Sequence, residues 1–270
     1  MIWHDYLHDK QSVSHIALHY GISESTVKRL LRSVRTQWNT QISLKNGVVQ
    51  IDVTYFGRNH GVMVAIDART GIPLYRSYTH HETARDYASA IRTICSFGYQ
   101  IEGIVIDGKQ NLFSLFADYK IQMCQFHMRA IIRRKLTKKP KLQASLELRD
   151  IMYTLTVSDR QSFEDAFHKW QVRWQAFINE RTVNLQTGRS FYTHQRLHSA
   201  AVSIKFYLPY LFTYQAVIDM PNTNNKIEGL FTSLKTSLHN HSGMCEQNRQ
   251  RYINGFLEAL KIPLYKTDRP

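Results

Sequence analysis

The stretch VVQIDVTYF, residues 48–56, decides the fold of this 270-residue chain. Apolar side chains alternate here with polar ones: Val49, Ile51, Val53 and Tyr55 against Gln50, Asp52 and Thr54. A period of two residues is typical of a β-strand. We therefore expect Asp52 in the middle of a strand, on the face opposite to the four apolar side chains.

Further strands and helices follow this first strand. In chain order we predict strands over residues 60–68 and 71–79 and a helix over 83–97. A strand over 104–107, a helix that begins near Gln110, a strand over 121–126 and a helix over 127–136 follow. The turn ARTG joins the second strand to the third at hairpin spacing, and the continuous apolar run at 104–106 is typical of a strand buried on both faces. The order predicts an α/β fold with a mixed five-stranded sheet and flanking helices.

Two aspartates occupy informative places in this sheet. Asp52 lies mid-strand, and Asp107 lies at the carboxyl end of the fourth strand, where α/β sheets commonly bind ligands. Two such carboxylates suit a divalent metal, because Mg²⁺ binds through one or two carboxylates and shares phosphate oxygens with a substrate. Asp67 also ends a strand, but a short turn follows it directly, where Asp is favoured for turn chemistry, so we leave it out of the site.

The N-terminal region has the pattern of a helix-turn-helix. One apolar helical face precedes Gly21, and Ser23 is a good N-cap for a second helix with Val27, Leu30 and Leu31 inward. The outward face of that helix carries the expected DNA-contacting residues Ser25, Thr26, Lys28, Arg29 and Arg32. The alternative is a helical hairpin that only packs on the rest of the chain. Residues 36–46 are predicted to be a linker.

A helical insertion is predicted over about residues 138–215. Its aromatic residues Phe163, Phe167, Trp170, Trp174 and Phe177 recur at helical spacing, which more often indicates core packing than a base-stacking surface. A basic cluster precedes and enters the insertion: Arg133, Arg134, Lys135, Lys138, Lys139 and Lys141. This cluster suits contacts with phosphates, and a solvated face is the alternative.

Composition favours a polyanionic partner. The chain has 35 Lys and Arg against 21 Asp and Glu, a formal net charge of +14 and a pI near 9.7. Nucleic acid is the first candidate and an acidic membrane surface the second. Three widely spaced cysteines do not form a disulfide framework, and we find no signal peptide or spanning segment. We expect a cytoplasmic protein that associates with the nucleoid.

The stretch PNTNNKIEGLF, residues 221–231, supplies a third acid, Glu228. Asn225 lies one helical turn before it, and Lys235 lies two turns after it, both on its face. A separate pair, Cys124 and His127, has the spacing of metal ligands, but a zinc site needs four ligands and no partner pair is evident.

These motifs together resemble the ribonuclease H-like catalytic core of DDE transposases, and most nearly the Mutator-like group of bacterial insertion sequences. The two aspartates stand in IDVTYF and VIDGKQNL, and the third acid stands in TNNKIEGLF, an N-x-x-E pattern. The C-x-x-H of Cys124 and His127 matches a motif of Mutator and hAT transposases. The resemblance covers residues 48–260, and successive acids follow at intervals of 55 and 121 positions. Many relatives begin with a cysteine-rich zinc-binding module, which this chain lacks.

The resemblance implies a transposase that cuts and transfers DNA strands at the ends of an insertion sequence. Asp52, Asp107 and Glu228 would hold two Mg²⁺ (or Mn²⁺) ions, with His127 near the scissile phosphate or in a structural contact. The implied partners are double-stranded DNA with terminal inverted repeats, target DNA and further copies of the chain. The implied divisions are a helix-turn-helix region over 1–46, core segments over 47–137 and 216–270, and an all-α insertion over 138–215. The alternatives are a protein or inactive remnant that binds element ends without cutting, and another ribonuclease H-like nuclease.

Overall fold

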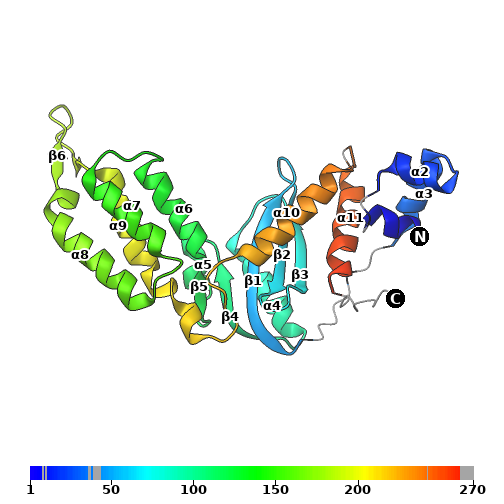
Figure 1. Cartoon of the computed structure of the whole chain (residues 1–270), viewed down its shortest axis with the longest axis horizontal. Coiled ribbons are helices and arrows are strands. Elements are labelled where there is room, and N and C mark those ends of the chain that lie inside the picture. Colours follow the sequence, from blue (N-terminus) through cyan, green and yellow to red (C-terminus); the bar gives the residue numbers. More distant parts are fainter. Residues whose placement is uncertain (8, 10, 36–37, 39–43, 242, 262–270) are drawn as a thin grey trace. The chain divides into compact units, whose positions relative to one another are not determined.

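A computed structural model describes residues 1–7, 9, 11–35, 38, 44–241 and 243–261 (Figure 1). Most of the predicted linker at 36–46 therefore lies outside the described residues. The chain divides into two compact units. The first unit contains Met1–Gly47, Ile51–Gln100 and Asn225–Pro270, and the second contains Val48–Gln50 and Ile101–Asn224. Within the described residues, no helix is both long and apolar enough to span a membrane.

Five strands form one mixed sheet. They are β1 (Asn46–Tyr55), β2 (Gly61–Asp67), β3 (Pro73–Thr79), β4 (Gln100–Ile106) and β5 (Ile121–Met123), in the spatial order β3-β2-β1-β4-β5. The pair β2–β3 is antiparallel, and the pair β4–β5 is parallel. The prediction of an α/β fold with a mixed five-stranded sheet is thus confirmed.

Both apolar and polar side chains of the central strand β1 are buried. The polar side chains of Gln50 and Thr54 are buried, whereas Tyr55 is exposed. Burial along β1 therefore does not follow the alternation of apolar and polar residues, because a central strand is covered on both faces. Gln50 satisfies its amide by donating from Nε2 to the backbone carbonyl of Thr223 at 2.9 Å.

The first unit also contains six helices among its described residues. They are α1 (Ile2–Leu7), α2 (Val13–Tyr20), α3 (Glu24–Ser33), α4 (Ala84–Ser96), α10 (Asn225–His239) and α11 (Glu246–Ala259). One hydrophobic core joins the N-terminal helices to β2, α10 and α11, and it includes Ile16, Val27, Val64, Phe231 and Tyr252. The N-terminal helices are therefore packed against β2, α10 and α11.

Local sequence explains where α2 and α3 begin and end. Ser12 and Ser23 cap the two helices by accepting hydrogen bonds from backbone N–H groups three residues later. Gly21 takes the left-handed conformation, with φ of 63°, at the C-cap of α2. Leu30, expected inward, is 40% exposed, because Val27 and Leu31 already occupy the buried stripe of α3.

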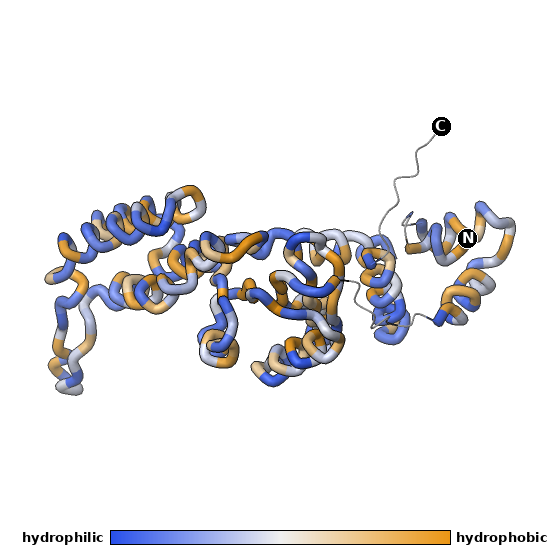
Figure 2. Tube along the Cα trace, turned by 90° about the horizontal axis from the view of Figure 1, so that it is seen from below, coloured by the Kyte–Doolittle hydropathy of each residue, from blue (hydrophilic) through white to orange (hydrophobic). Residues whose placement is uncertain are grey.

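The helices of the second unit are α5 (Gln110–Leu115), α6 (Gln125–Leu136), α7 (Gln143–Thr154), α8 (Arg160–Asn179) and α9 (Gln195–Tyr207), followed by two 3₁₀ turns at Leu208–Tyr210 and Thr213–Ala216. Hydrophobic and hydrophilic segments alternate along these helices, as amphipathic packing requires (Figure 2). The aromatic stripe of α8 is core at its start, where Phe163, Phe167 and Trp170 are buried, and half-buried further on. Trp170 donates from Nε1 to the Ala144 carbonyl of α7 at 2.9 Å.

The expectation of an all-α insertion is wrong. An antiparallel hairpin of β6 (Arg181–Val183) and β7 (Ser190–Tyr192) separates α8 from α9. The chain reverses between them through Asn184, whose side chain accepts from two backbone N–H groups, and Gly188, which has φ of 66°. Asn and Gly in these places end the helical periodicity and close a turn.

Candidate functional site

Asp52 lies within β1, the central strand of the sheet. Its side chain is half-buried, and Oδ1 accepts a hydrogen bond from the backbone N–H of Val53 at 2.7 Å. A half-buried carboxylate on a central strand is held in a rigid environment.

Asp107 directly follows β4, the strand next to β1 in the sheet. Burial raises the pKa of this half-buried carboxyl, and the backbone N–H of Lys109 and the ring of His127 act in the opposite direction. The Lys109 N–H donates to Oδ1 of Asp107 at 3.2 Å. The carboxylate form is therefore poorly solvated, and a nearby cation would stabilise it.

The turn that carries Asp107 is tightly packed in the second unit. A Cβ atom at Gly108 would lie 2.5 Å from Cδ1 of Ile131 and 2.8 Å from Cε of Met123. The Tyr207 hydroxyl donates to the Gly108 carbonyl at 2.5 Å. Glycine thus lets α6 approach this turn, and Tyr207 fixes the turn from α9.

Glu228 lies in the first turn of α10 and is half-buried. Asn225 and Lys235, on the same helix, are both exposed. The start of α10 is anchored by Lys226, whose Nζ donates to the backbone carbonyls of Ala68 and Arg69, each at 2.7 Å. The anchor fixes the helical turn that presents Glu228.

Cys124 and His127 lie together at the start of α6. The Cys124 thiol sulfur and a ring nitrogen of His127 are within 4.8 Å of each other. Cys124 is buried, and its Sγ accepts from the backbone N–H of Asn224 at 3.3 Å. The predicted pair is thus brought together, with a sulfur already engaged by the asparagine-rich loop before α10.

This loop contains polar residues that sequence reasoning overlooked. The Gln125 backbone N–H donates to the Asn222 carbonyl, and the Asn222 side chain donates to Oε1 of Gln125, both at 2.9 Å. The Asn224 side chain is fully buried, with no hydrogen-bond partner for its amide among the described residues. The run of asparagines was the sequence signal, but the prediction selected exposed Asn225 rather than buried Asn224.

The predicted DNA-contacting residues of α3 divide into two groups. Lys28, Arg29 and Arg32 are exposed, and Lys28 pairs with Glu24 at 3.2 Å. The hydroxyls of Ser25 and Thr26 instead hydrogen-bond to Oγ of Ser23, at 2.8 and 2.9 Å. Lys28 is thus engaged in an ion pair, Arg29 and Arg32 are exposed, and the two hydroxyls belong to the cap of the helix.

The basic residues at the end of α6 are similarly divided. Arg133 and Arg134 are exposed, whereas half-buried Lys135 donates a hydrogen bond to Ser199 of α9. Arg133 lines a cavity of about 230 Å³ between α6 and α7, where the Arg129 guanidinium lies 5.2 Å from the ring centroid of Tyr153. The surface between α6 and α7 combines cations with an exposed aromatic ring.

Comparison with known proteins gives little sequence similarity. No family model matches the chain, and no curated protein matches it. Among solved structures, the chain is similar to one in the cryoEM structure of the simian T-cell lymphotropic virus intasome in complex with PP2A regulatory subunit B56 gamma. That similarity has a TM-score of 0.25 and 16% sequence identity, and covers 73% of this chain and 70% of that chain. By its own fold, the protein is an α/β protein whose mixed sheet is compatible with a ribonuclease H-like architecture.

Proposed function

We propose that the protein is a metal-dependent DDE transposase that cleaves and transfers DNA strands at insertion-sequence ends. One observation carries the proposal: Asp52 lies in β1, Asp107 directly follows β4, and these strands are neighbours in the mixed sheet. Glu228, on the anchored first turn of α10, is the proposed third acid. The order of these acids along the chain matches the resemblance to Mutator-like transposases.

The three acids suit hard divalent cations. Carboxylate oxygens are the ligands that Mg²⁺ and Mn²⁺ prefer, and the poorly solvated carboxylate of Asp107 would be stabilised by a cation. Asp52, Asp107 and Glu228 would hold the ions, which would supply an activated water or 3′-hydroxyl and stabilise charge on the leaving oxygen. Cys124 and His127 are proposed as accessory residues beside Asp107, since His127 acts electrostatically on that carboxyl.

The basic residues bind and orient DNA in this proposal. Lys28, Arg29 and Arg32 on α3 contact the terminal inverted repeats. Ser25 and Thr26, predicted as DNA contacts, instead support the start of this helix through their bonds to Ser23. Arg133 and Arg134 on α6 bind phosphates, and so does Lys235 on α10. Transposition joins two element ends to target DNA, so we propose a homo-oligomer acting on the nucleoid.

A DNA-binding protein that does not cut is the second candidate, since the exposed cations of α3 serve both functions. The separating experiment incubates the protein with DNA carrying the repeats that flank its own gene, in Mg²⁺ or Mn²⁺. We expect cleavage that is lost in Asp52→Ala and Glu228→Gln but retained in Asp118→Ala, which alters an exposed aspartate. Specific binding without cleavage in either metal would favour the second candidate.

A further inference from the structure

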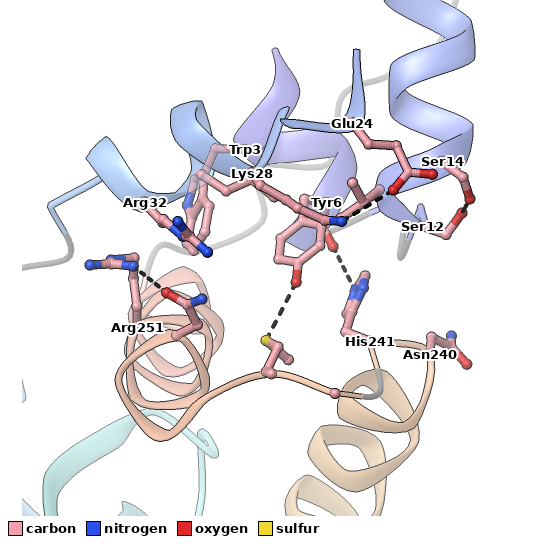
Figure 3. Close-up of a pocket in the computed structure, with 15 residues that line it drawn as sticks. Trp3, Tyr6, Ser12, Ser14, Glu24, Lys28, Arg32, Asn240, His241 and Arg251 are labelled. Atoms are coloured by element: carbon pink, nitrogen blue, oxygen red, sulfur yellow. Dashed lines mark hydrogen bonds and ion pairs between the residues drawn. The ribbon is translucent and has the colours of Figure 1, made fainter. Parts of the chain in front are cut away.

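A cavity of about 360 Å³ lies within the first unit, beside α3 (Figure 3). Its walls come from α1, α2, α3, α11 and the segment between α10 and α11. Part of the lining is aromatic, and the hydroxyl of Tyr6 donates a hydrogen bond to Sδ of Met244 at 3.4 Å. The sequence assigned no role to this place.

The cavity has an excess of positive charge. Lys28, Arg32 and Arg251 line it, and Glu24 is the only acid among the described residues that does so. Glu24 is bound to Lys28 at 3.2 Å. His241 also lines the cavity, but burial lowers its pKa, so the ring is neutral at pH 7. Two arginines are therefore left without an acidic partner among the described lining residues.

These two arginines come from different ends of the chain. Arg32 extends from α3 and Arg251 from α11, and both guanidinium groups lie at the same side of the cavity (Figure 3). Arg251 is half-buried and donates from Nη1 to Oδ1 of Asn248 at 2.8 Å, which orients its guanidinium. Two like charges repel each other, and an anion bound between them is attracted to both.

The donors suit a phosphate group better than a carboxylate. A guanidinium presents a planar fork of N–H donors that matches phosphate oxygens in pairs, and two such forks with Lys28 exceed the two oxygens of a carboxylate. The hydroxyls of Ser12 and Ser14, 3.0 Å apart at the start of α2, are further donors at the opposite wall.

We propose that this cavity is a phosphate-binding site in which Arg32 and Arg251 hold one phosphate group between α3 and α11. The expected source is the DNA backbone, so the inference deepens the proposed function and extends its DNA interface to the last helix. A free phosphorylated compound is the other source of the same chemistry. In either case, Arg251 is a ligand-binding residue.

The test measures the affinity of a labelled duplex by fluorescence anisotropy, in EDTA and at several salt concentrations. Arg32→Ala and Arg251→Ala should each weaken binding about tenfold and reduce the slope of log affinity against log salt by about one. Arg92→Ala is the matched control, because Arg92 is an exposed cation on α4 of the same unit. It should leave both quantities nearly unchanged.

The double variant distinguishes a shared phosphate from general charge. If Arg32 and Arg251 hold the same group, the loss in Arg32→Ala/Arg251→Ala should be smaller than the product of the single losses. Losses that multiply, in folded variants with normal circular dichroism, would show that the arginines act separately and would overturn the proposal for DNA.

A second arm tests the free source. Inorganic phosphate and pyrophosphate are added during thermal unfolding, with chloride at matched ionic strength as the reference. A rise in Tm for the wild type that is absent in both arginine variants, together with unchanged DNA affinity, assigns the site to a free phosphate compound. The proposal is wrong if the two arginine variants match the wild type in DNA affinity and in the rise of Tm caused by phosphate.

The outcome is separable from that of the proposed function. DNA affinity in EDTA does not require the carboxylates, whereas strand cleavage does. If Arg251→Ala cleaves DNA and binds it with the affinity of the wild type, only the proposal of the phosphate site is wrong. If the effects of Arg32→Ala and Arg251→Ala on DNA affinity are coupled but the protein never cleaves DNA, only the proposal of a transposase is wrong.

Discussion

The Tyr99 hydroxyl donates a hydrogen bond to Oδ2 of Asp67 at 2.7 Å, inside the core of the first unit. Asp67 is 1% exposed, and its Oδ1 accepts from the backbone N–H and the hydroxyl of Thr70. Gly47 makes room for this pair, because a Cβ atom there would lie 2.6 Å from the Tyr99 hydroxyl. Asp67 thus has a structural role at this turn.

Asp67→Ala is therefore expected to destabilise the protein. The change removes the carboxylate that accepts hydrogen bonds from the buried Tyr99 hydroxyl and from the Thr70 N–H, which should lower the free energy of unfolding by about 1–3 kcal/mol. Urea unfolding followed by circular dichroism measures it, with Asp118→Ala as the exposed control. A stability equal to wild type would contradict the structural role.

Gly108→Ala is expected to disturb the turn that presents Asp107. The new methyl group meets Cδ1 of Ile131 and Cε of Met123 at less than contact distance. Both atoms end flexible side chains that can turn away, so the variant should lose about 1 kcal/mol, at the low end of the cost of overpacking, and part of its cleavage rate. Gly229→Ala is the matched control, since a Cβ at this position of α10 has no atom within 4 Å among the described residues. It should be neutral or gain up to about 1 kcal/mol, because Ala favours a helix. Equal effects of the two changes would contradict the packing account.

Lys226→Met is expected to slow cleavage without weakening DNA binding. The change removes both hydrogen bonds that tie the first turn of α10 to the end of β2, so Glu228 is less firmly positioned. Loss of a supporting contact at a metal site costs about 10- to 100-fold in activity. Lys226→Arg retains a donor and should recover part of the rate. A Lys226→Met enzyme with a normal rate would show that the anchor is dispensable.

His241 predicts a pH-dependent stability. Burial lowers its pKa, although its Nε2 contact with the Tyr6 carbonyl at 3.2 Å acts in the opposite direction. The unfolded chain therefore takes up the proton first, and the contribution to stability, present above about pH 6.5, is lost as the pH falls.

His241→Phe keeps an aromatic ring against Tyr6 and Tyr252 but removes the titrating group. The decline in the free energy of unfolding between about pH 7 and pH 5 should be smaller in this variant. Denaturant unfolding across that range measures the decline, and identical declines in the two proteins would count against the assignment.

Sequence periodicity was sufficient for the existence of the five strands of the main sheet, and local residue types were sufficient for the turn at Gly21 and the cap of α3 at Ser23. These features depend on neighbouring residues. Periodicity failed where distant segments decide burial. The buried side chain of Gln50 has its hydrogen-bond acceptor in Thr223, and Lys135 donates to Ser199 rather than to solvent. Neither partner is close in sequence, so no local pattern reports it.

The candidate site shows the same division. The motifs marked Asp52, Asp107 and Glu228, but nothing local indicated the turn packing around Gly108 or the buried amide of Asn224. Arg251 was not predicted as a binding residue, because only the fold brings α11 and α3 to the cavity that Arg251 and Arg32 line.

The most direct test of the central claim is strand cleavage by Asp107→Asn, which keeps the size of the side chain and removes its charge. Wild-type protein and this variant are incubated in Mg²⁺ with DNA carrying the flanking inverted repeats, and end binding is measured in parallel in EDTA. We predict that the variant binds the ends as wild type does and produces no cleaved strands. Cleavage by Asp107→Asn at the wild-type rate would contradict the assignment of a carboxylate metal centre at the end of β4.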